Sequence, residues 1–172
     1  GFLLADGYGS FFIHRYDKDG NWLSKFGGPG KGDGTFATPH GICVDRRSGK
    51  EQVAICDRAH QTLQFLDLKG NHKQTLTGYG LPANLDTLGK LMLVPELHAR
   101  ITLLNEKNEV VVRLGDDVES VVKKKSVHRG KSDTWKNGKF VHPHDACFAP
   151  NGDIYVAEWV QSGRITKLKK VS

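Results

Sequence analysis

The chain has 172 residues, of which 38% are hydrophobic and 26% charged, and its formal net charge is +6 at pH 7. This composition is typical of a globular domain with a buried core, and 20 glycines beside one methionine favour tight turns between short strands over helices. No run approaches the ~18 apolar residues that cross a bilayer, so we predict no membrane partner. The opening residues GFLLADGYGS lack a basic region and a cleavage site, so we expect no signal peptide within the chain.

Residues 1–36 are predicted to form three strands. The apolar run FLLAD precedes GSFFIHRYDKDGNWLSKFG, in which apolar residues at Ile13 and Tyr16 lead into a D-G turn and a further alternating segment. The D-G pair supplies the positive φ angles of a hairpin turn. These three strands correspond to the second, third and fourth strands of the units that follow, so residues 1–36 are a partial unit.

Residues 37–79 contain a complete four-stranded unit. Pro39 opens the strand HGICVD, QVAICD forms the second strand, and QTLQFLDLKGN aligns without gaps with the first segment, placing Leu63 opposite Ile13. The distance from Pro39 to Pro82, where the next unit begins, is about 43 residues, which is the length of a propeller blade.

Residues 80–141 repeat the pattern with an insertion. Pro82 opens ANLDTL, KLMLVP follows, and ARITLLNEKNEVVVRLG places Ile101 at the repeat position. The excess length lies in residues 118–140, which hold seven lysines and arginines: Lys123, Lys124, Lys125, Arg129, Lys131, Lys136 and Lys139. Nucleic-acid binding favours a regular basic surface with stacking aromatics, and only Trp135 is near. We therefore interpret the segment as a solvated, lysine-rich loop and predict no nucleic-acid partner.

Residues 142–172 form the last partial unit, with Pro143 opening HDACFA, then DIYVAE, and GRITKLKK placing Ile165 at the repeat position. The fold class predicted is all-β: a β-propeller segment of about three and a half four-stranded blades. Uneven ends would leave exposed sheet edges, which proteins avoid. We therefore expect further N-terminal blades or a partner chain to close a ring, which we predict to have six blades.

The three cysteines Cys43, Cys56 and Cys147 show no metal-type C-x-x-C spacing. Each lies in an apolar strand, where a cysteine commonly acts as a small buried hydrophobe. A disulfide between two of them is the alternative.

Histidine follows the strand-opening proline in alternate units: His40, then Ala83, then His144. The first strand of a blade lines the central channel, so imidazoles at these positions would point toward one axis. Three neutral imidazoles arranged in this way make a zinc site, and the third would lie in blades outside this chain. Two alternatives remain open: each histidine bonds a neighbouring carbonyl as a structural strand entry, or His142 and His144 form a ligand pair in H-P-H.

The segments TPHGICVD and HPHDACFAP, together with ADGYGS and ICDRAH, carry a family resemblance. The chain resembles bacterial NHL-repeat propellers and, more distantly, the six-bladed peptidyl-α-hydroxyglycine α-amidating lyases. The resemblance covers nearly the whole chain apart from residues 118–140. It implies zinc ligation by His40 and His144 and a structural calcium at Asp145.

The resemblance also implies a catalytic base at Tyr8 and an active-site arginine at Arg58. With zinc on the substrate hydroxyl, Tyr8 would take the proton and Arg58 would hold a carboxylate through its planar fork. The sequence departs from the lyase pattern in having His142 where methionine is expected and S-F-F after Tyr8, and the second arginine lies outside the chain. The resemblance also suggests an exported protein, although no residue of the chain shows the compartment.

Two functions follow from these observations. The first is a metal-dependent, lyase-like propeller acting on a peptide or other small substrate. The second is a non-catalytic propeller whose loops bind a protein, peptide or carbohydrate, in which Tyr8 caps a loop and Arg58 pairs with a surface carboxylate. A fold alone does not decide between them.

Overall fold

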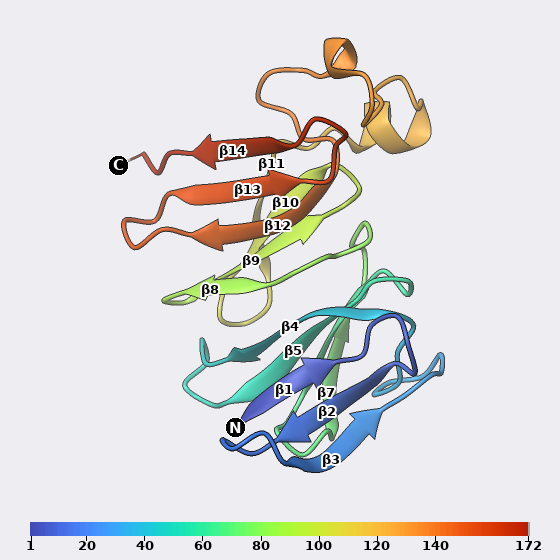
Figure 1. Cartoon of the computed structure of the whole chain (residues 1–172). Coiled ribbons are helices and arrows are strands. Elements are labelled where there is room, and N and C mark those ends of the chain that lie inside the picture. Colours follow the sequence, from blue (N-terminus) through green and yellow to red (C-terminus); the bar gives the residue numbers. More distant parts are fainter. Residues whose placement is uncertain (172) are drawn as a thin grey trace. The chain divides into compact units, whose positions relative to one another are not determined.

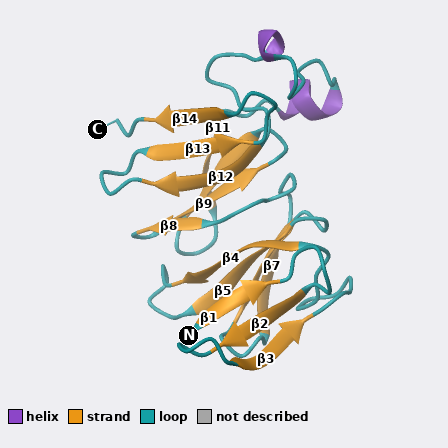
Figure 2. Cartoon of the chain, in the orientation of Figure 1, coloured by secondary structure: helices purple, strands orange, loops and turns teal. Residues whose placement is uncertain are grey.

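The structure is a computed structural model that describes residues 1–171. Over this range, strands β1 to β14 form four antiparallel sheets, and the only helical segments described are two short turns (Figures 1 and 2). The chain divides into two compact units, Gly1–Pro82 and Ala83–Ser172. Each unit holds one four-stranded and one three-stranded sheet.

The first unit begins with the three-stranded sheet β1-β2-β3 and continues with the four-stranded sheet β4-β5-β6-β7. All of its strands join in sequence by turns and pair antiparallel, which is the arrangement within a propeller blade. The bounds are β1 Phe2–Ala5, β2 Phe12–Tyr16, β3 Trp22–Gly27, β4 Pro39–Asp45, β5 Gln52–Asp57, β6 Thr62–Leu66 and β7 His72–Leu76.

The second unit reverses that order, with the four-stranded sheet β8-β9-β10-β11 first and the three-stranded sheet β12-β13-β14 second. The bounds are β8 Asp86–Leu88, β9 Leu91–Glu96, β10 Arg100–Leu104, β11 Val110–Leu114, β12 Pro143–Phe148, β13 Ile154–Glu158 and β14 Arg164–Leu168. The all-β prediction is therefore confirmed, with four antiparallel sheets of three or four strands.

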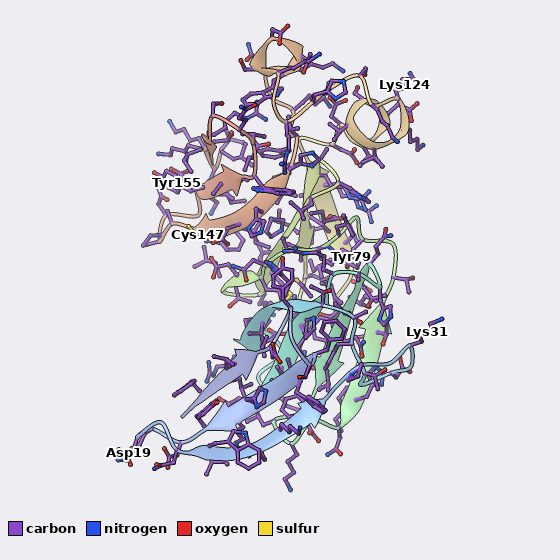
Figure 3. All side chains as sticks on the ribbon, turned by 45° about the vertical axis from the view of Figure 1, so that its right-hand side comes forward. Asp19, Lys31, Tyr79, Lys124, Cys147 and Tyr155 are labelled. Carbon is purple, nitrogen blue, oxygen red and sulfur yellow. The ribbon has the colours of Figure 1, made fainter. Side chains whose placement is uncertain are left out.

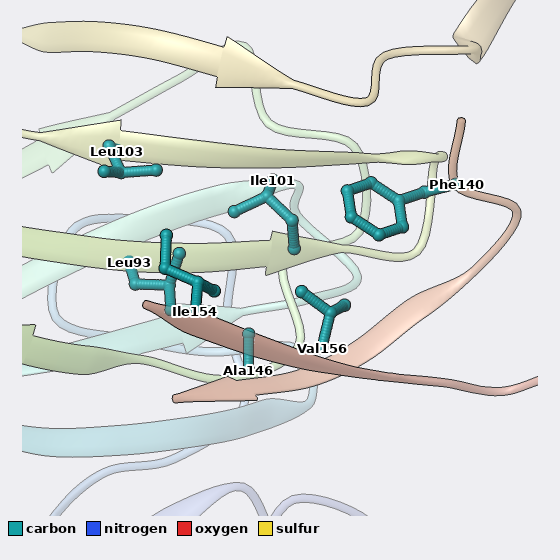
Figure 4. Close-up of a cluster of buried hydrophobic side chains, with 7 residues drawn as sticks. All are labelled: Leu93, Ile101, Leu103, Phe140, Ala146, Ile154 and Val156. Carbon is teal, nitrogen blue, oxygen red and sulfur yellow. The ribbon is translucent and has the colours of Figure 1, made fainter. Parts of the chain in front are cut away.

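Each unit buries its core between its own two sheets. In the first unit, Ile13 and Phe36 pack with Val53 and Ile55. In the second, Leu93 and Ile101 pack with Ala146 and Val156, and Phe140 closes the end of the cluster (Figure 4). Alternation along each strand turns one row of apolar side chains toward the facing sheet, which is why the repeat pattern is visible in the sequence.

The second of the three predicted strand-opening prolines, Pro82, differs from the other two. The strand expected to start at Pro82 begins at Asp86 instead, and Ala83 lies outside it, with its N–H donating to the Pro95 carbonyl at 2.9 Å. The Asp86 carboxylate accepts a hydrogen bond from the Phe148 amide at 2.7 Å, on the neighbouring sheet. Strand β8 is three residues long, and this bond ties its first residue to β12.

The basic insertion is more ordered than a solvated loop. It contains a helical turn at Glu119–Lys123 and another at Ser132–Thr134. Val121 and Val127 are buried against Ala99, Val141 and Val160. The lysines remain exposed, as on the turn labelled at Lys124 in Figure 3, so the insertion is amphipathic: its valines pack on the blade and its charges face solvent.

Within residues 1–171 the three cysteines form no disulfide, so the disulfide alternative is wrong for them. Cys56 is buried, as expected, but Cys43 is half-buried and Cys147 is exposed. Cys147 lies on β12, in the three-stranded sheet at the C-terminal end (Figure 3). No helix within residues 1–171 has the length and apolar character needed to cross a membrane.

Candidate functional site

A buried aspartate shapes the turn that carries Arg58. Asp57 ends β5 and is fully buried, and its carboxylate accepts hydrogen bonds from the Ala37 amide at 2.8 Å and from Gln64 Nε2 at 3.0 Å. His60 Nδ1 lies 2.7 Å from the same carboxylate. Asp57 thus fastens the end of the second strand to the segment that leads into β4.

Tyr8 lies in the turn between β1 and β2. The Asp6 carboxylate accepts a hydrogen bond from the Ser10 amide at 2.7 Å, which closes this turn. Gly7 sits against the start of β4, and a Cβ built on it would come within 2.8 Å of the Pro39 carbonyl oxygen. Because glycine has no side chain, the turn can approach β4 closely enough to place Tyr8 beside His40.

Tyr8, Arg58 and His40 form a contact group, which we call the Tyr8 cluster. Arg58 Nη1 donates a hydrogen bond to the Tyr8 hydroxyl oxygen at 2.7 Å. The Tyr8 ring meets the His40 ring edge-on, with 5.9 Å between centroids and 89° between planes. Residues 50 positions apart are therefore joined at one end of the unit, where antiparallel pairing predicts that strand ends return.

The tyrosine of this cluster is open to solvent while the other two members are partly covered. Tyr8 is 78% exposed, whereas Arg58 and His40 are half-buried. A phenol that accepts a hydrogen bond from a guanidinium keeps its own O–H available to donate. The cluster thus presents a proton-bearing oxygen, a cation and an imidazole on an accessible surface.

The second unit holds the other predicted site residues. His144 is half-buried in β12, and Asp145 beside it is exposed. Asp145 Oδ1 accepts hydrogen bonds from Asn84 Nδ2 at 2.7 Å and from the Ala146 amide at 2.8 Å. This carboxylate therefore links the segment before β8 to β12.

His142 is part of a backbone contact. Its Nδ1 lies 2.6 Å from the Leu97 carbonyl oxygen, and because a carbonyl only accepts, Nδ1 carries the hydrogen. His142 also precedes β12, which starts at Pro143, so the alternation of a strand does not apply to His142 and His144. The structure thus gives His142 a carbonyl contact; the carbonyl contact considered for His40 and His144 stays a prediction.

The described residues do not assemble a metal site. A catalytic zinc needs three protein ligands and calcium needs six to eight oxygens. Within residues 1–171, no group of three or more His, Cys, Asp or Glu side chains is placed to hold a metal ion. His40 belongs to the first unit and His144 to the second, so each unit supplies one of the imidazoles proposed for zinc.

Sequence reasoning missed two buried acids equivalent to Asp57. Glu96 ends β9 and Glu158 ends β13, and both are buried. Glu96 accepts hydrogen bonds from Arg100 Nε at 2.9 Å, and Glu158 accepts one from the Val141 amide at 2.7 Å and pairs with Arg164. The signal was present, since an acid closes the second strand in D-I-Y-V-A-E as it does in Q-V-A-I-C-D.

Comparison with known proteins supports the fold. No family model and no curated protein sequence matches the chain. A protein of unknown function from Bacteroides caccae is similar over 92% of this chain and 55% of its own length, with a TM-score of 0.62 and 16% identity. Virginiamycin B lyase from Staphylococcus aureus is similar over 99% of this chain and 55% of its own, with a TM-score of 0.58 and 11% identity.

A streptogramin B lyase structure is similar over 99% of this chain and 54% of its own length, with a TM-score of 0.56 and 11% identity. The chain therefore spans about half the length of these structures. At such identities the likeness shows the fold: the chain is a segment of a β-propeller. Membership of the NHL family stays a prediction, as does the catalytic or metal role of each site residue.

Proposed function

We propose that this chain is part of a lyase-type propeller enzyme in which the Tyr8 cluster contacts a carboxylate-bearing substrate. The observation that carries the proposal is the 2.7 Å hydrogen bond from Arg58 to Tyr8 beside His40. Two adjoining turns are shaped to form it, one by Gly7 and the other by Asp57. The lyases among the similar structures are consistent with an enzymatic use of this fold.

The proposed reaction is elimination from a peptidyl-α-hydroxyglycine. The deprotonated Tyr8 oxygen accepts the proton of the substrate hydroxyl, the oxygen lone pair forms the C=O bond of glyoxylate, and the C–N bond breaks. The leaving amide nitrogen takes up a proton, which yields the peptide amide. Arg58 holds the substrate carboxylate, because a planar guanidinium matches a carboxylate with two parallel N–H donors.

The proposal includes a zinc ion and a calcium ion, whose content in the intact protein can be measured. His40 and His144 supply two imidazoles, and the third would come from blades beyond this chain. A zinc ion bound there would lower the pKa of the substrate hydroxyl. Asp145 is the proposed calcium contact. Metal analysis of the intact protein, before and after His40→Ala and His144→Ala, tests zinc independently of turnover, and the same analysis of Asp145→Ala tests calcium.

Turnover of a peptidyl-α-hydroxyglycine by the intact protein tests the Tyr8 cluster. Tyr8→Phe should lower kcat by about 10² to 10⁴, because it deletes only the proton acceptor. Arg58→Ala should chiefly raise KM for the carboxylate substrate. Tyr155→Phe, at an exposed tyrosine of the second unit, is the matched control and should leave kcat unchanged. If Tyr8→Phe turns over like Tyr155→Phe, the proposed role of Tyr8 is wrong.

A binding platform is the second candidate, and the 78% exposure of Tyr8 favours it. Tyrosine rings with a wet hydroxyl are common anchors of protein interfaces. An intact protein that turns over no peptidyl-α-hydroxyglycine, but whose partner binding is lost in Tyr8→Ala, would establish this function in place of the lyase.

A further inference from the structure

The second unit contains a pocket that the proposed lyase chemistry does not use. It has a volume of about 400 Å³ and lies between the basic insertion and the turn joining β9 to β10, which carries His98. Pockets of this size are typical of small-molecule sites. Val121 and Val127, which belong to the buried valine cluster of the insertion, form its apolar side.

The polar side of the pocket is cationic. Lys125 and Arg129 line it together with His98, His128 and His142. Of the lining residues within 1–171, none is Asp or Glu. Glu119 of the insertion pairs with Lys123 and Lys124, and Asp117, just before the insertion, pairs with Lys136. The local charge therefore favours an anion.

Arg129 is held in place from two sides. Its guanidinium carbon lies 3.8 Å from the centroid of the Trp159 ring, and its carbonyl accepts a hydrogen bond from the Gln161 amide at 3.0 Å. Stacking uses the flat face of the guanidinium, so the N–H groups along its edge stay able to donate. Arg129 is thus a positioned donor on the pocket wall.

The histidines add donors and acceptors. His142 Nδ1 is bonded to the Leu97 carbonyl, which fixes the ring. Burial lowers the pKa of His98 below its ordinary value; Glu96 opposes this shift, and His142 and Arg100 add to it. A neutral imidazole there both donates and accepts a hydrogen bond.

We propose that this pocket binds a small organic anion, with its carboxylate at Lys125 and Arg129 and its apolar body on Val121 and Val127. The proposal goes beyond the function assigned to the Tyr8 cluster, whose residues all lie in the other unit. A carboxylate accounts for the cations and an apolar body for the valines, so a ligand with both should bind better than a ligand with either one.

The test is a titration of the intact protein with 3-phenylpropanoate, in which binding is measured by calorimetry and by changes in amide chemical shifts. We expect shifts at Val121, Val127 and Arg129. The neutral 3-phenylpropanamide and the small anion acetate should each bind at least about tenfold more weakly, since each lacks one of the two contacts.

Two lysine variants separate the pocket from general attraction of anions to a basic surface. Lys125 has a left-handed backbone, with φ of 52°, so Lys125→Gly removes the cation while relieving strain. It should weaken 3-phenylpropanoate binding by about tenfold. Lys123→Ala removes the same charge from a residue outside the pocket lining and should change binding by less than about twofold.

Several outcomes would overturn the proposal. One is equal weakening by Lys125→Gly and Lys123→Ala, and another is equal affinity for the acid and the amide. Shifts that map to Tyr8 and His40, with binding lost in Arg58→Ala, would assign the anion to the Tyr8 cluster instead. The absence of binding at about 10 mM ligand, where even a millimolar complex is largely formed, would also refute it.

Discussion

The two units end their second strands alike and differ at the residue that follows. Asp57 in the first unit and Glu96 and Glu158 in the second are all buried acids at a strand end. Each carboxylate accepts a hydrogen bond within its own unit. Asp57 and Glu158 bond to the backbone before the first strand of their sheets, and Glu96 bonds to Arg100 across the following turn. After Asp57 comes Arg58, which reaches Tyr8, and after Glu158 comes Trp159, which stacks under Arg129. Glu96 is followed by the buried Leu97.

This comparison assigns structural support to the buried acid and surface chemistry to the residue that follows it. The buried acid fixes the path of the turn by satisfying backbone and side-chain donors, and it does so whatever residue comes next. The residue after it varies: Arg58 is half-buried and Trp159 is exposed, whereas Leu97 is buried. A phenol–guanidinium pair has formed in one unit and a cationic pocket in the other on the same structural base.

The largest expected effect is the loss of a buried acid. Glu96→Ala would leave the Arg100 guanidinium, whose side chain is 15% exposed, without its 2.9 Å carboxylate contacts. Removing one partner of a buried ion pair costs about 3–5 kcal/mol. We expect a loss of that size in the free energy of unfolding, measured by urea denaturation.

Arg58→Ala is the variant to compare with Glu96→Ala, because Arg58 is the residue that follows a buried acid. Because Arg58 is half-buried and bonds an exposed tyrosine, we expect it to lower the free energy of unfolding by less than about 1 kcal/mol. Equal losses in the two variants would contradict the division between supporting acid and variable neighbour.

The second comparison is between two isoleucines at the equivalent position of the repeat. Ile101 is fully buried in the second unit, whereas Ile165, at the equivalent place on β14, is 71% exposed. Ile101→Ala should cost about 2–5 kcal/mol, and Ile165→Ala less than about 0.5 kcal/mol in the 172-residue chain. Thermal unfolding of both variants measures this. A large loss for Ile165→Ala would show that its face is covered, for example by a second copy of the chain.

A glycine pair tests how closely the Tyr8 turn must approach β4. Gly7→Ala would place a Cβ 2.8 Å from the Pro39 oxygen, and we expect a loss of about 1–2 kcal/mol with a displaced Tyr8. Gly32→Ala meets nothing within 4 Å and should be neutral or slightly stabilising. Unfolding curves measure the stability change, and the amide chemical shift of His40 reports the displacement. Neutral behaviour of Gly7→Ala would mean that the turn is looser than the structure places it.

The smallest effect concerns the turns between third and fourth strands. Hydrogen bonds from Asn71 and Lys69 lower the pKa of Asp67 to about 2 from 3.8. Since the folded pKa is the lower one, the turn's added stability is full above pH 3.8 and is lost as the pH falls to about 2. After correction for the intrinsic pH dependence, amide hydrogen exchange in this turn should therefore become faster as the pH falls from 3.8 to about 2.

The equivalent turn in the second unit is the control, because Asn105 accepts the same backbone hydrogen bonds with an amide that does not titrate. Glu106, whose pKa is lowered by a backbone hydrogen bond, and Glu109, which accepts from Asn105, titrate in this turn, so both are replaced by Gln in the control. Its exchange should then stay constant from about pH 4 down to about pH 2 apart from the intrinsic pH dependence. Asp67→Asn should make the first turn behave like the second. Parallel responses of the wild-type first turn and this control turn would refute the role of the carboxylate.

Much of the fold could be predicted because it is local. Alternation of apolar residues and D-G or K-G-N turns mark a strand and its end, and the gap-free alignment at Ile13, Leu63 and Ile101 identified the repeat. The meeting of Tyr8 with Arg58 and His40 also follows from antiparallel strand order. The residue types at these places determined the strands, their faces and the contents of the Tyr8 cluster.

Burial was decided by the tertiary structure. Ile165 and Cys147 lie in apolar strands, as the buried Ile101 and Cys56 do, yet they are exposed because their sheet face meets no neighbour within the described part of the chain. Glu96 looks like a surface acid in the sequence, but it is buried because Arg100 and Thr102 converge on it. The basic insertion folds over Ala99 by burying valines that lie between its lysines. Periodicity specifies which way a side chain points, and only the packing of distant segments decides what covers it.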